Sequence, residues 1–413
     1  MTSQTQFQLL HQKSQSSLAL APGSYIYSLC QSGADALAAI SSDNSLRLFD
    51  RQTLHLLPDG VFKDVHPGRG GGVTCVREVH PTVSGGKNLI ATSGRDGTVK
   101  IWDTRNAKRD AVLTVTAGKA PPITALACGT EMSSIVAGTE LVSSQASVIF
   151  WDIRSPNQAR LQYVECHNDD ITEILYQVYP VQFFPTDSPQ LQFHPTRSNV
   201  LLSGSTDGLV NIYDTTITDE DEALLQVVNH GSIHHAGFLG EDAIYALSHD
   251  EVFSIHPLNN LNENVAEPAA IQFGDLRPVL HNDYVVQVLD GRGGSFVASG
   301  KTSEQLLDIT PLVSSPQYQF DQSNTWRLPG AHGEEVVRSV FLDDNSKTIF
   351  TCGEDGYVRS WKADESEVAP AETKSTEEQS LKHSKRSAPE DGARVKKHGK
   401  EKKHKKERGF KPY

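Results

Sequence analysis

The chain has 413 residues, of which 37% are hydrophobic and 22% charged, with 31 glycines and 20 prolines. This is the composition of a turn-rich soluble protein, with room for one large repeat domain or two or three ordinary domains. No window of 18 uninterrupted apolar residues exists and the N-terminus lacks the basic start and apolar core of a secretory signal, so neither a membrane span nor a signal peptide is expected.

The net charge of −13 is divided unevenly along the chain. Residues 382–413 contain 13 Lys and Arg against four acidic residues, a net charge of +9, which leaves −22 for the preceding 381 residues. An acidic body with a basic tail presents two surfaces of opposite charge to partners. The five cysteines lie far apart without a C-x-x-C pair, which predicts reduced, mostly buried thiols and argues against a zinc site or a disulfide framework.

A recurring phrase organises most of the chain. It is clearest at Leu201–Asp214, LLSGSTDGLVNIYD, where an apolar run, an Asp-Gly turn and an alternating run end on an aromatic residue and an aspartate. Asp-Gly between two β-type runs is a strong hairpin signal. Related phrases occur at Leu37–Asp50, Ile90–Asp103, Ile135–Asp152 and Ile349–Lys362.

Two weaker units complete the series, at Ala243–Leu258 and Ser295–Val313. The seven units end near residues 50, 103, 152, 214, 257, 312 and 362. A repeat period of roughly 40 to 50 residues with a closing Trp-Asp is typical of a β-propeller. The phrases resemble the WD40-repeat family over roughly Phe7 to Lys362. The resemblance implies an all-β fold, a seven-bladed WD40 β-propeller over residues 22–362.

The resemblance also implies a structural network in each complete blade. A histidine precedes the first strand, a Ser or Thr lies in the second strand, an Asp in the following turn, and a Trp or Tyr in the third strand. Such buried polar groups must satisfy one another. The matching residues are His332, Thr351, Asp355 and Trp361 in the last blade, His167, Ser203, Asp207 and Tyr213 in the fourth, and Thr92, Asp96 and Trp102 in the second.

In the second blade the histidine position falls on His66, within a glycine-rich segment. The first, third, fifth and sixth blades lack parts of the network, so we expect apolar packing to hold them together.

The last blade ends one strand short, because the phrase stops at Trp361 and a different composition follows. An exposed strand edge would be prone to association. We therefore expect the N-terminal segment, residues 1–21, to supply the missing outer strand through Phe7–Lys13.

One segment interrupts the fourth blade. Its first strand is expected to join Ile171 and Thr172 to Gln190–Pro195, with Glu173–Pro189 inserted between them. Loops tolerate insertions and strands do not. Two explanations stay open: a translated intron, or a loop that bulges out to bind a partner.

The sequence favours no catalytic, cofactor or metal site. Ser, His and Asp recur, as in a hydrolase triad, but at the structural positions of the propeller and without a G-x-S-x-G elbow. We therefore expect no enzymatic activity.

Two adjacent units end in a Trp-Asp-x-Arg box. In some WD40 proteins this box docks the chain onto the adaptor of a cullin-4 ubiquitin ligase, whereas the arginine can also simply pair with the aspartate beside it. The candidate docking residues are Trp102, Asp103 and Arg105 in one box and Trp151, Asp152 and Arg154 in the other.

The C-terminal part divides into an acidic linker, residues 363–381, and a Lys/Arg-rich tail, residues 382–413, expected to be disordered because it has few apolar residues. Dense basic runs predict nuclear import, with nucleolar residence as an extension, or weak, sequence-independent RNA contact. The candidate import residues are Lys385, Arg386, Lys396, Lys397, Lys402, Lys403, Lys405 and Lys406.

Taken together, these features predict a protein-interaction scaffold, a monomeric propeller within a larger complex, nuclear with some cytoplasmic protein. A cullin-4 substrate receptor and a ribosome-biogenesis or RNA-associated factor are the alternatives. Partner identity and the binding face are beyond the sequence.

Overall fold

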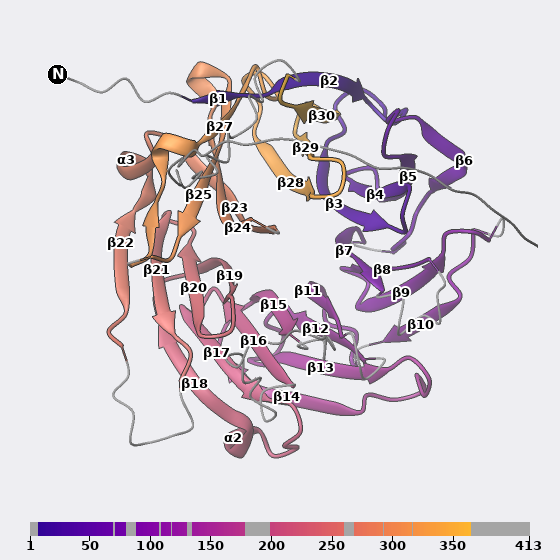
Figure 1. Ribbon diagram of the computed structural model, residues 1–413. Coiled ribbons are helices and arrows are strands. Elements are labelled where there is room, and N and C mark those ends of the chain that lie inside the picture. Colours follow the sequence, from indigo (N-terminus) through magenta and orange to yellow (C-terminus); the bar gives the residue numbers. More distant parts are fainter. Residues whose placement is uncertain are drawn as a thin grey trace, which may run out of the picture. The chain divides into compact units, whose positions relative to one another are not determined.

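The computed structural model describes residues 7–68, 71–79, 88–106, 109–116, 118–129, 134–177, 199–259, 268–291, 293–315 and 317–364. The chain divides into two units, Met1–Glu367 and Val368–Tyr413, and the second lies wholly outside the described residues. The first unit is a seven-bladed β-propeller, which confirms the fold predicted from the repeated phrase (Figure 1).

Blades one to five each contain four consecutive antiparallel strands. The sheet of blade six has six strands, one of them from the N-terminal segment, and blade seven also takes one strand from that segment. Blades one and two contain β3 (Ile26–Ser32), β4 (Ala36–Ser41), β5 (Ser45–Asp50) and β6 (Leu56–Phe62), then β7 (Val73–Val79), β8 (Leu89–Gly94), β9 (Thr98–Asp103) and β10 (Leu113–Thr116). Blades three and four contain β11 (Ile123–Cys128), β12 (Ser134–Thr139), β13 (Ala146–Asp152) and β14 (Leu161–His167), then β15 (Ile171–Gln177), β16 (Val200–Ser205), β17 (Leu209–Asp214) and β18 (Leu224–Asn229).

Blades five and six carry the weaker phrases and are more decorated. Blade five contains β19 (Ile233–Leu239), β20 (Ala243–Ser248), β21 (Val252–Pro257) and β22 (Ile271–Asp275). Blade six contains β23 (Tyr284–Gly291), β24 (Gly294–Lys301), β25 (Leu306–Val313) and β27 (Trp326–Pro329), with the short β26 (Gln319–Phe320) also paired to β25. Blade seven contains β28 (Val337–Asp343), β29 (Thr348–Gly353) and β30 (Val358–Lys362).

Helical segments are short. They are α2 (Glu220–Ala223), α3 (Leu276–Leu280), η1 (Thr302–Glu304) and η2 (Gln322–Asn324). Among the described residues, no helix has the length and apolar character needed to cross a bilayer.

Every inner strand carries a β-bulge near its start, after the first residue in six blades and after the second residue, Val285, in blade six. The register against the second strand of the blade shifts between Ile26 and Ser28 in blade one, and at the equivalent place in each of the other six blades. A bulge increases local twist and re-aims the following side chains. The seven bulges therefore give the channel wall its regular lining.

The apolar core consists of seven clusters of buried residues, one between each pair of neighbouring blades. One of them joins blade seven to blade one, since Phe350 and Val358 pack with Leu37 and Phe49. Because each sheet buries both faces against its neighbours, the hydrophobic contribution to stability depends on the ring being closed.

The N-terminal segment closes the ring. Strand β2 (His11–Ser16) pairs antiparallel with β30 as the outer strand of blade seven, and β1 (Gln8–Leu9) pairs parallel with β27 of blade six (Figure 1). Leu10, between the two strands, is 6% exposed and belongs to the same cluster as Trp361. The residues proposed for this strand, Phe7–Lys13, thus overlap two short strands on neighbouring blades.

The expected interruption of the fourth inner strand is wrong. Ile171–Gln177 forms one continuous strand, and Glu173 pairs with Gly204 beyond the bulge. The run Glu-Ile-Leu-Tyr-Gln is itself suited to a strand, and Ile174 is buried. The additional residues therefore lie in the connection to β16, and residues 178–198 of that connection are outside the described part.

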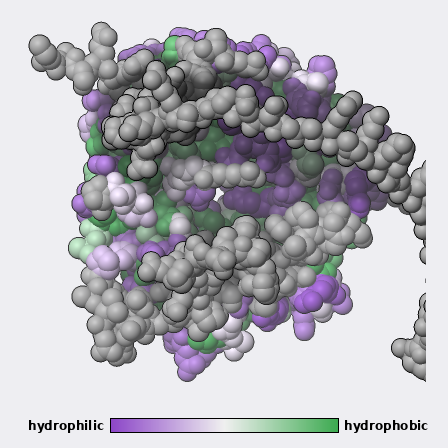
Figure 2. Space-filling view, in the orientation of Figure 1, coloured by the Kyte–Doolittle hydropathy of each residue, from purple (hydrophilic) through white to green (hydrophobic). Residues whose placement is uncertain are grey.

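Figure 2 shows one face of the molecule in the same orientation, with hydrophilic and hydrophobic residues interspersed around a hollow at the centre of the ring. The acidic linker beyond residue 364 and the basic tail lie outside the described residues, so their expected disorder stays a prediction.

Candidate functional site around the central channel

The inner strands of all seven blades line a cavity of about 460 Å³ along the axis of the ring. The residue that follows each bulge faces this space. In blade order these residues are Ser28, Cys75, Ala125, Glu173, His235, Gln287 and Ser339. The backbone of the ring thus repeats from blade to blade while the side chains facing the channel vary. Blades one and seven both present a serine and the other five blades each present a different residue type, as expected of a surface that distinguishes partners.

The bulged residues link neighbouring blades. The hydroxyl of Tyr27 donates to the Val73 carbonyl at 2.8 Å. In the same way Thr124 donates to the Ile171 carbonyl at 2.7 Å. These bonds join the start of one inner strand to the start of the next, so they fix the spacing of the blades around the channel.

Sequence reasoning missed these linking hydroxyls, although a signal was present. Three inner strands begin with a β-branched residue followed by threonine, as VTCV, ITAL and ITEI. The third, Thr172, donates to the Ile233 carbonyl at 2.8 Å. Only the neighbouring blade reveals what the threonine bonds.

Two ionisable side chains, His235 and Glu173, lie close together on one side of the channel. His235 Nδ1 lies 3.0 Å from Glu173 Oε2, and both side chains are largely buried. The ring of Tyr245 fills the space beside Gly237, where a Cβ would lie 2.7 Å from its Cε1. Burial raises the pKa of Tyr245, and the Glu173 charge adds to that rise, so the phenol is neutral at physiological pH.

Blade seven contains the complete four-residue network. His332 Nε2 lies 2.8 Å from Thr351 Oγ1 and its Nδ1 lies 2.7 Å from Asp355 Oδ1. The indole N–H of Trp361 donates to the same Thr351 hydroxyl at 3.0 Å. The network therefore connects four parts of the blade: the turn before β28, the strand β29, the turn between β29 and β30, and the strand β30.

Blade two has the same arrangement. His66 Nε2 lies 2.8 Å from Thr92 Oγ1, His66 Nδ1 lies 2.9 Å from Asp96 Oδ1, and Trp102 donates to Thr92 at 2.9 Å. A Cβ at Gly94 would lie 2.2 Å from the imidazole, so the buried ring needs a glycine there.

In blade four the network has three members. His167 bonds Ser203 at 2.8 Å and Asp207 at 3.1 Å, but the hydroxyl of Tyr213 accepts instead from Asn211 Nδ2 at 3.1 Å. The ring of Tyr213 stacks on Tyr163 with centroids 5.0 Å apart. The hydroxyl of a tyrosine lies at the far end of its ring, whereas the N–H of a tryptophan lies on the side of the indole. The Tyr213 hydroxyl therefore extends past the Ser203 hydroxyl and bonds Asn211 instead.

A basic residue four positions after the turn aspartate is a further member that sequence reasoning missed. Arg359 Nη1 donates to Asp355 Oδ2 at 2.5 Å, and Lys100 Nζ lies 3.7 Å from Asp96 Oδ2. Arg47 bonds Asp43 at 2.6 Å in blade one, where the histidine network is absent from the sequence pattern. The signal is Asp-x-x-x-Lys/Arg, as in DGYVR, DGTVK and DNSLR.

These networks have the bonding order of a catalytic triad, hydroxyl to imidazole to carboxylate. The hydroxyls are inaccessible, however: Thr351, Ser203 and Thr92 are each 0% exposed. A nucleophile must reach its substrate, so these groups stabilise the blades and do not perform chemistry.

The buried imidazoles predict acid sensitivity. Burial lowers the pKa of His332 and of His66 below the ordinary value, although the carboxylates of Asp355 and Asp96 oppose the shift. The unfolded chain then binds protons that the folded chain does not, so stability is present above about pH 6.5 and is lost as the pH falls below that value. We expect the free energy of unfolding, measured by urea titration, to fall between pH 7 and pH 5 by up to about 1.4 kcal/mol per pH unit for each histidine. A flat profile over this range would contradict the assignment.

The arginine of each Trp-Asp-x-Arg box forms a bidentate pair with the aspartate two residues before it. Arg105 Nε and Nη2 lie 3.1 Å from the two carboxylate oxygens of Asp103. Arg154 makes the same fork with Asp152 at 3.0 and 2.7 Å. Both boxes follow the third strand of adjacent blades, so both forks lie on the same face of the ring.

The same fork also occurs outside a Trp-Asp-x-Arg box, where Arg277 bonds Asp275 at the end of β22. The arginine side chains of the two boxes are 52% and 71% exposed. We therefore expect Arg105→Ala with Arg154→Ala to leave the urea midpoint unchanged within error, because exposed pairs contribute little to stability. A substantial fall would show a structural role instead.

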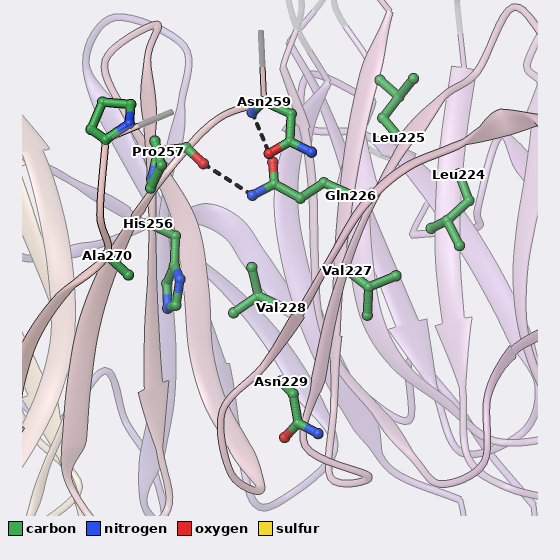
Figure 3. A pocket seen from close by; sticks show the side chains of 11 residues that line it. Leu224, Leu225, Gln226, Val227, Val228, Asn229, His256, Pro257, Asn259 and Ala270 are labelled. Carbon is green, nitrogen blue, oxygen red and sulfur yellow. Dashed lines mark hydrogen bonds between the residues drawn. The ribbon is translucent and has the colours of Figure 1, made fainter. Parts of the chain in front are cut away.

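A groove lies at the rim, between blades four and five. It has a volume of about 620 Å³, and the outer strand β18 forms one wall. The Gln226 amide bridges the two blades, donating to the Pro257 carbonyl at 3.0 Å and accepting from the Asn259 N–H at 2.9 Å (Figure 3). Val227 on the same strand is 49% exposed.

All five cysteines are free; Cys166 and Cys352 are buried and the other three are half-buried, so the expectation of mostly buried thiols holds for two of the five. Burial raises the pKa of the Cys128 and Cys166 thiols to about 12, so neither is a thiolate at neutral pH. Among the described residues, no group of three or more His, Cys, Asp or Glu side chains is placed to hold a metal ion.

Comparison with known proteins places the chain in a family. Residues 60–103 and 323–362 match the WD domain, G-beta repeat family. The chain is 32% identical over 285 residues to an uncharacterized WD repeat-containing protein of Schizosaccharomyces pombe, covering 67% of this chain and 80% of that protein. The chain therefore belongs to the WD40-repeat family, whose propellers typically bind other proteins and generally serve as non-enzymatic scaffolds.

Two further proteins resemble this chain. An uncharacterized WD repeat-containing protein of Saccharomyces cerevisiae is 36% identical over 276 residues, which is 67% of this chain and 64% of that protein's length. The WD repeat-containing protein 89 homolog of Dictyostelium discoideum is 23% identical over 79% of each chain. The phrases Ser205–Leu224 and Ile244–Ile255 are those by which the sequence alone resembles WD repeat-containing protein 89.

Proposed function

We propose that this protein is a non-enzymatic scaffold that acts in the nucleus as one subunit of a larger complex. The observation that supports it most is a closed propeller whose backbone repeats at every blade while the residues that face the channel vary, with Glu173, His235 and Gln287 in three successive blades. Bonds between blades hold that lining in place, so loops and channel residues are presented without further ordering. Preorganisation of this kind increases affinity for a partner.

The nuclear assignment rests on the basic tail. Residues 382–413 carry a net charge of +9 and contain the paired basic residues typical of import signals. Removing Lys382–Tyr413 from a fluorescently tagged protein should shift it from the nucleus to the cytoplasm. Equal distribution of the two forms would contradict the assignment.

A second candidate is a cullin-4 substrate receptor, favoured by the two exposed arginine forks on one face of adjacent blades. Purification of tagged wild type and the Arg105→Ala, Arg154→Ala variant from cells, followed by mass spectrometry, tests it. Adaptor recovered with the wild type alone would support the ligase role. Other nuclear proteins recovered equally with both forms would support the scaffold and assign the arginines to rim structure.

The RNA-associated alternative is supported by the charge of the tail, because a polycation binds phosphate backbones through counterion release. It requires RNA binding that weakens steeply with salt and disappears when Lys382–Tyr413 is removed. Retention of RNA by the truncated form would exclude the tail as the contact.

A further inference from the structure

A second cavity, of about 400 Å³, opens beside the channel between blades five, six and seven. We call it the Glu251 cavity, after the one residue whose buried side chain has an unpartnered atom. Its lining consists of His234, His235, Glu251, Tyr284, Arg338, Thr302 and four valines, Val285, Val286, Val336 and Val337.

Glu251 occupies a turn position at which three other blades have glycine, while blades one and six have Asn44 and Gln305 with φ of 58° and 55°. It lies in the turn between β20 and β21 with φ of 62°, in the left-handed region. The equivalent turn residues Gly97, Gly208 and Gly356 also have positive φ. A non-glycine residue in this conformation is strained, and such strain persists where the side chain has a use.

The side chain of Glu251 is poorly satisfied for a buried carboxyl group. The residue is only 9% exposed, and its Oε2 has no hydrogen-bond partner among the described residues. Burial raises the pKa of Glu251 to about 6, against a hydrogen bond from the backbone of Val285, so the group is still mainly ionised at pH 7. An unpaired buried carboxylate is costly and implies a missing cation.

The basic side chains around Glu251 already have partners. Arg338 Nε donates to Glu354 at 2.8 Å, and Arg277 is forked on Asp275. His235 pairs with Glu173. Glu251 is therefore a carboxylate in the cavity lining that no neighbouring basic side chain pairs with.

His234 adds an uncharged donor and acceptor. Its ring lies 4.4 Å from that of His235 and 5.2 Å from that of His249, measured between centroids. Burial lowers the pKa of His234 to about 3, assisted by His235, His249 and Arg338, so the imidazole is neutral. A neutral imidazole beside a carboxylate accepts from a bound cation without repelling it.

We propose that the Glu251 cavity binds the side chain of a lysine from a partner protein, an inference that rests on the scaffold function proposed above. Glu251 Oε2 accepts from the ammonium group, and the valines contact the aliphatic stem. Oε2 is the one Glu251 oxygen that is buried without a partner among the described residues, and a single acceptor suits a compact ammonium ion better than the two-pronged guanidinium of arginine.

The test uses the full-length protein with ¹³C-labelled valine methyl groups. The probe is N-acetyl-lysine methylamide, and its Nε-acetylated form is the uncharged control. Saturable shifts of the Val285, Val286, Val336 and Val337 methyl signals are expected with the lysine probe and not with the acetylated probe. Absence of saturable shifts, or equal shifts with both probes, would overturn the proposal.

Two substitutions and a matched control locate the contact. Glu251→Gln should weaken binding of the lysine probe by about tenfold or more, as expected when a charged hydrogen-bond acceptor is lost. Glu251→Gly should abolish binding while raising Tm, because glycine relieves the strained φ and removes the unpaired carboxyl group. Glu241→Gln, an exposed glutamate at the opposite end of β20, should bind as the wild type does. Unchanged binding of the lysine probe by Glu251→Gln would show that the Glu251 carboxylate does not hold the ammonium group.

The same variants separate this inference from the scaffold function. If the lysine probe fails to bind but nuclear proteins still co-purify with the protein, the cavity assignment is wrong and the scaffold stands. If the probe binds through Glu251 and no protein co-purifies, the site stands and the scaffold function falls.

Discussion

Deleting residues 1–17 is expected to make the protein aggregate. The deletion removes β1 and β2, so β30 loses its partner and presents an open strand edge. It also removes Leu10 from the cluster that covers Trp361, which is 1% exposed in the intact ring. The combined loss exceeds about 4 kcal/mol, the range in which single structural lesions unfold a domain.

The measurement is the soluble, monomeric fraction on size-exclusion chromatography, supported by urea unfolding of two point variants. Leu10→Ser should cost about 3 kcal/mol, since it empties a buried site. Leu9→Ser, one residue away but 42% exposed, should stay within about 0.5 kcal/mol of the wild type. A truncated protein that remained monomeric with an unchanged urea midpoint would show that the N-terminal strands do not close the ring.

His332→Ala is expected to lower the free energy of unfolding by about 3 kcal/mol. The substitution leaves the Thr351 hydroxyl without its imidazole partner in a site that is 0% exposed, and it opens a cavity beneath the turn. Asp355 retains Arg359, so the carboxylate is not left wholly unpaired. The loss should therefore come mainly from the hydroxyl and the cavity.

Urea unfolding of the variant beside His55→Ala checks this prediction. His55 is exposed, so its removal should change the midpoint little. If both substitutions had equally small effects, the network would be incidental to the stability of the seventh blade.

The sequence predicted the ring well because its signals are local. The Asp-Gly turns and the alternation around them depend on residues a few positions apart, and third strands end at Asp50, Asp103, Asp152, Asp214, Pro257 and Lys362 as the phrases do. The sixth phrase, expected to end near residue 312, ends one residue later, at Val313.

The fourth inner strand shows where local signals fail. Glu173–Gln177 and Gln190–Phe193 both have strand-forming composition, and the sequence alone gave no means of choosing between them. The choice is made by pairing with β16 and by the contact of Ile174 with Gly138 of blade three, where a Cβ would lie 2.9 Å from the isoleucine Cδ1. Contacts between blades are invisible to a reading of one blade at a time.

The candidate site was only partly visible for the same reason. That Glu251 replaces the usual turn glycine could be seen in the sequence, but not that its carboxylate is buried without a partner. Nor does the sequence show that His234 and His235 lie on β19 at the cavity wall, or that His230 bonds the Val252 carbonyl at 2.9 Å.

The most direct test of the scaffold account is the native size and composition of the protein in nuclear extract. Size-exclusion chromatography of the extract, followed by affinity capture and mass spectrometry of the eluted peak, measures both. The account predicts elution well above the 45.2 kDa of the single chain, with stoichiometric nuclear partners. Elution as a lone monomer without stoichiometric partners would contradict it.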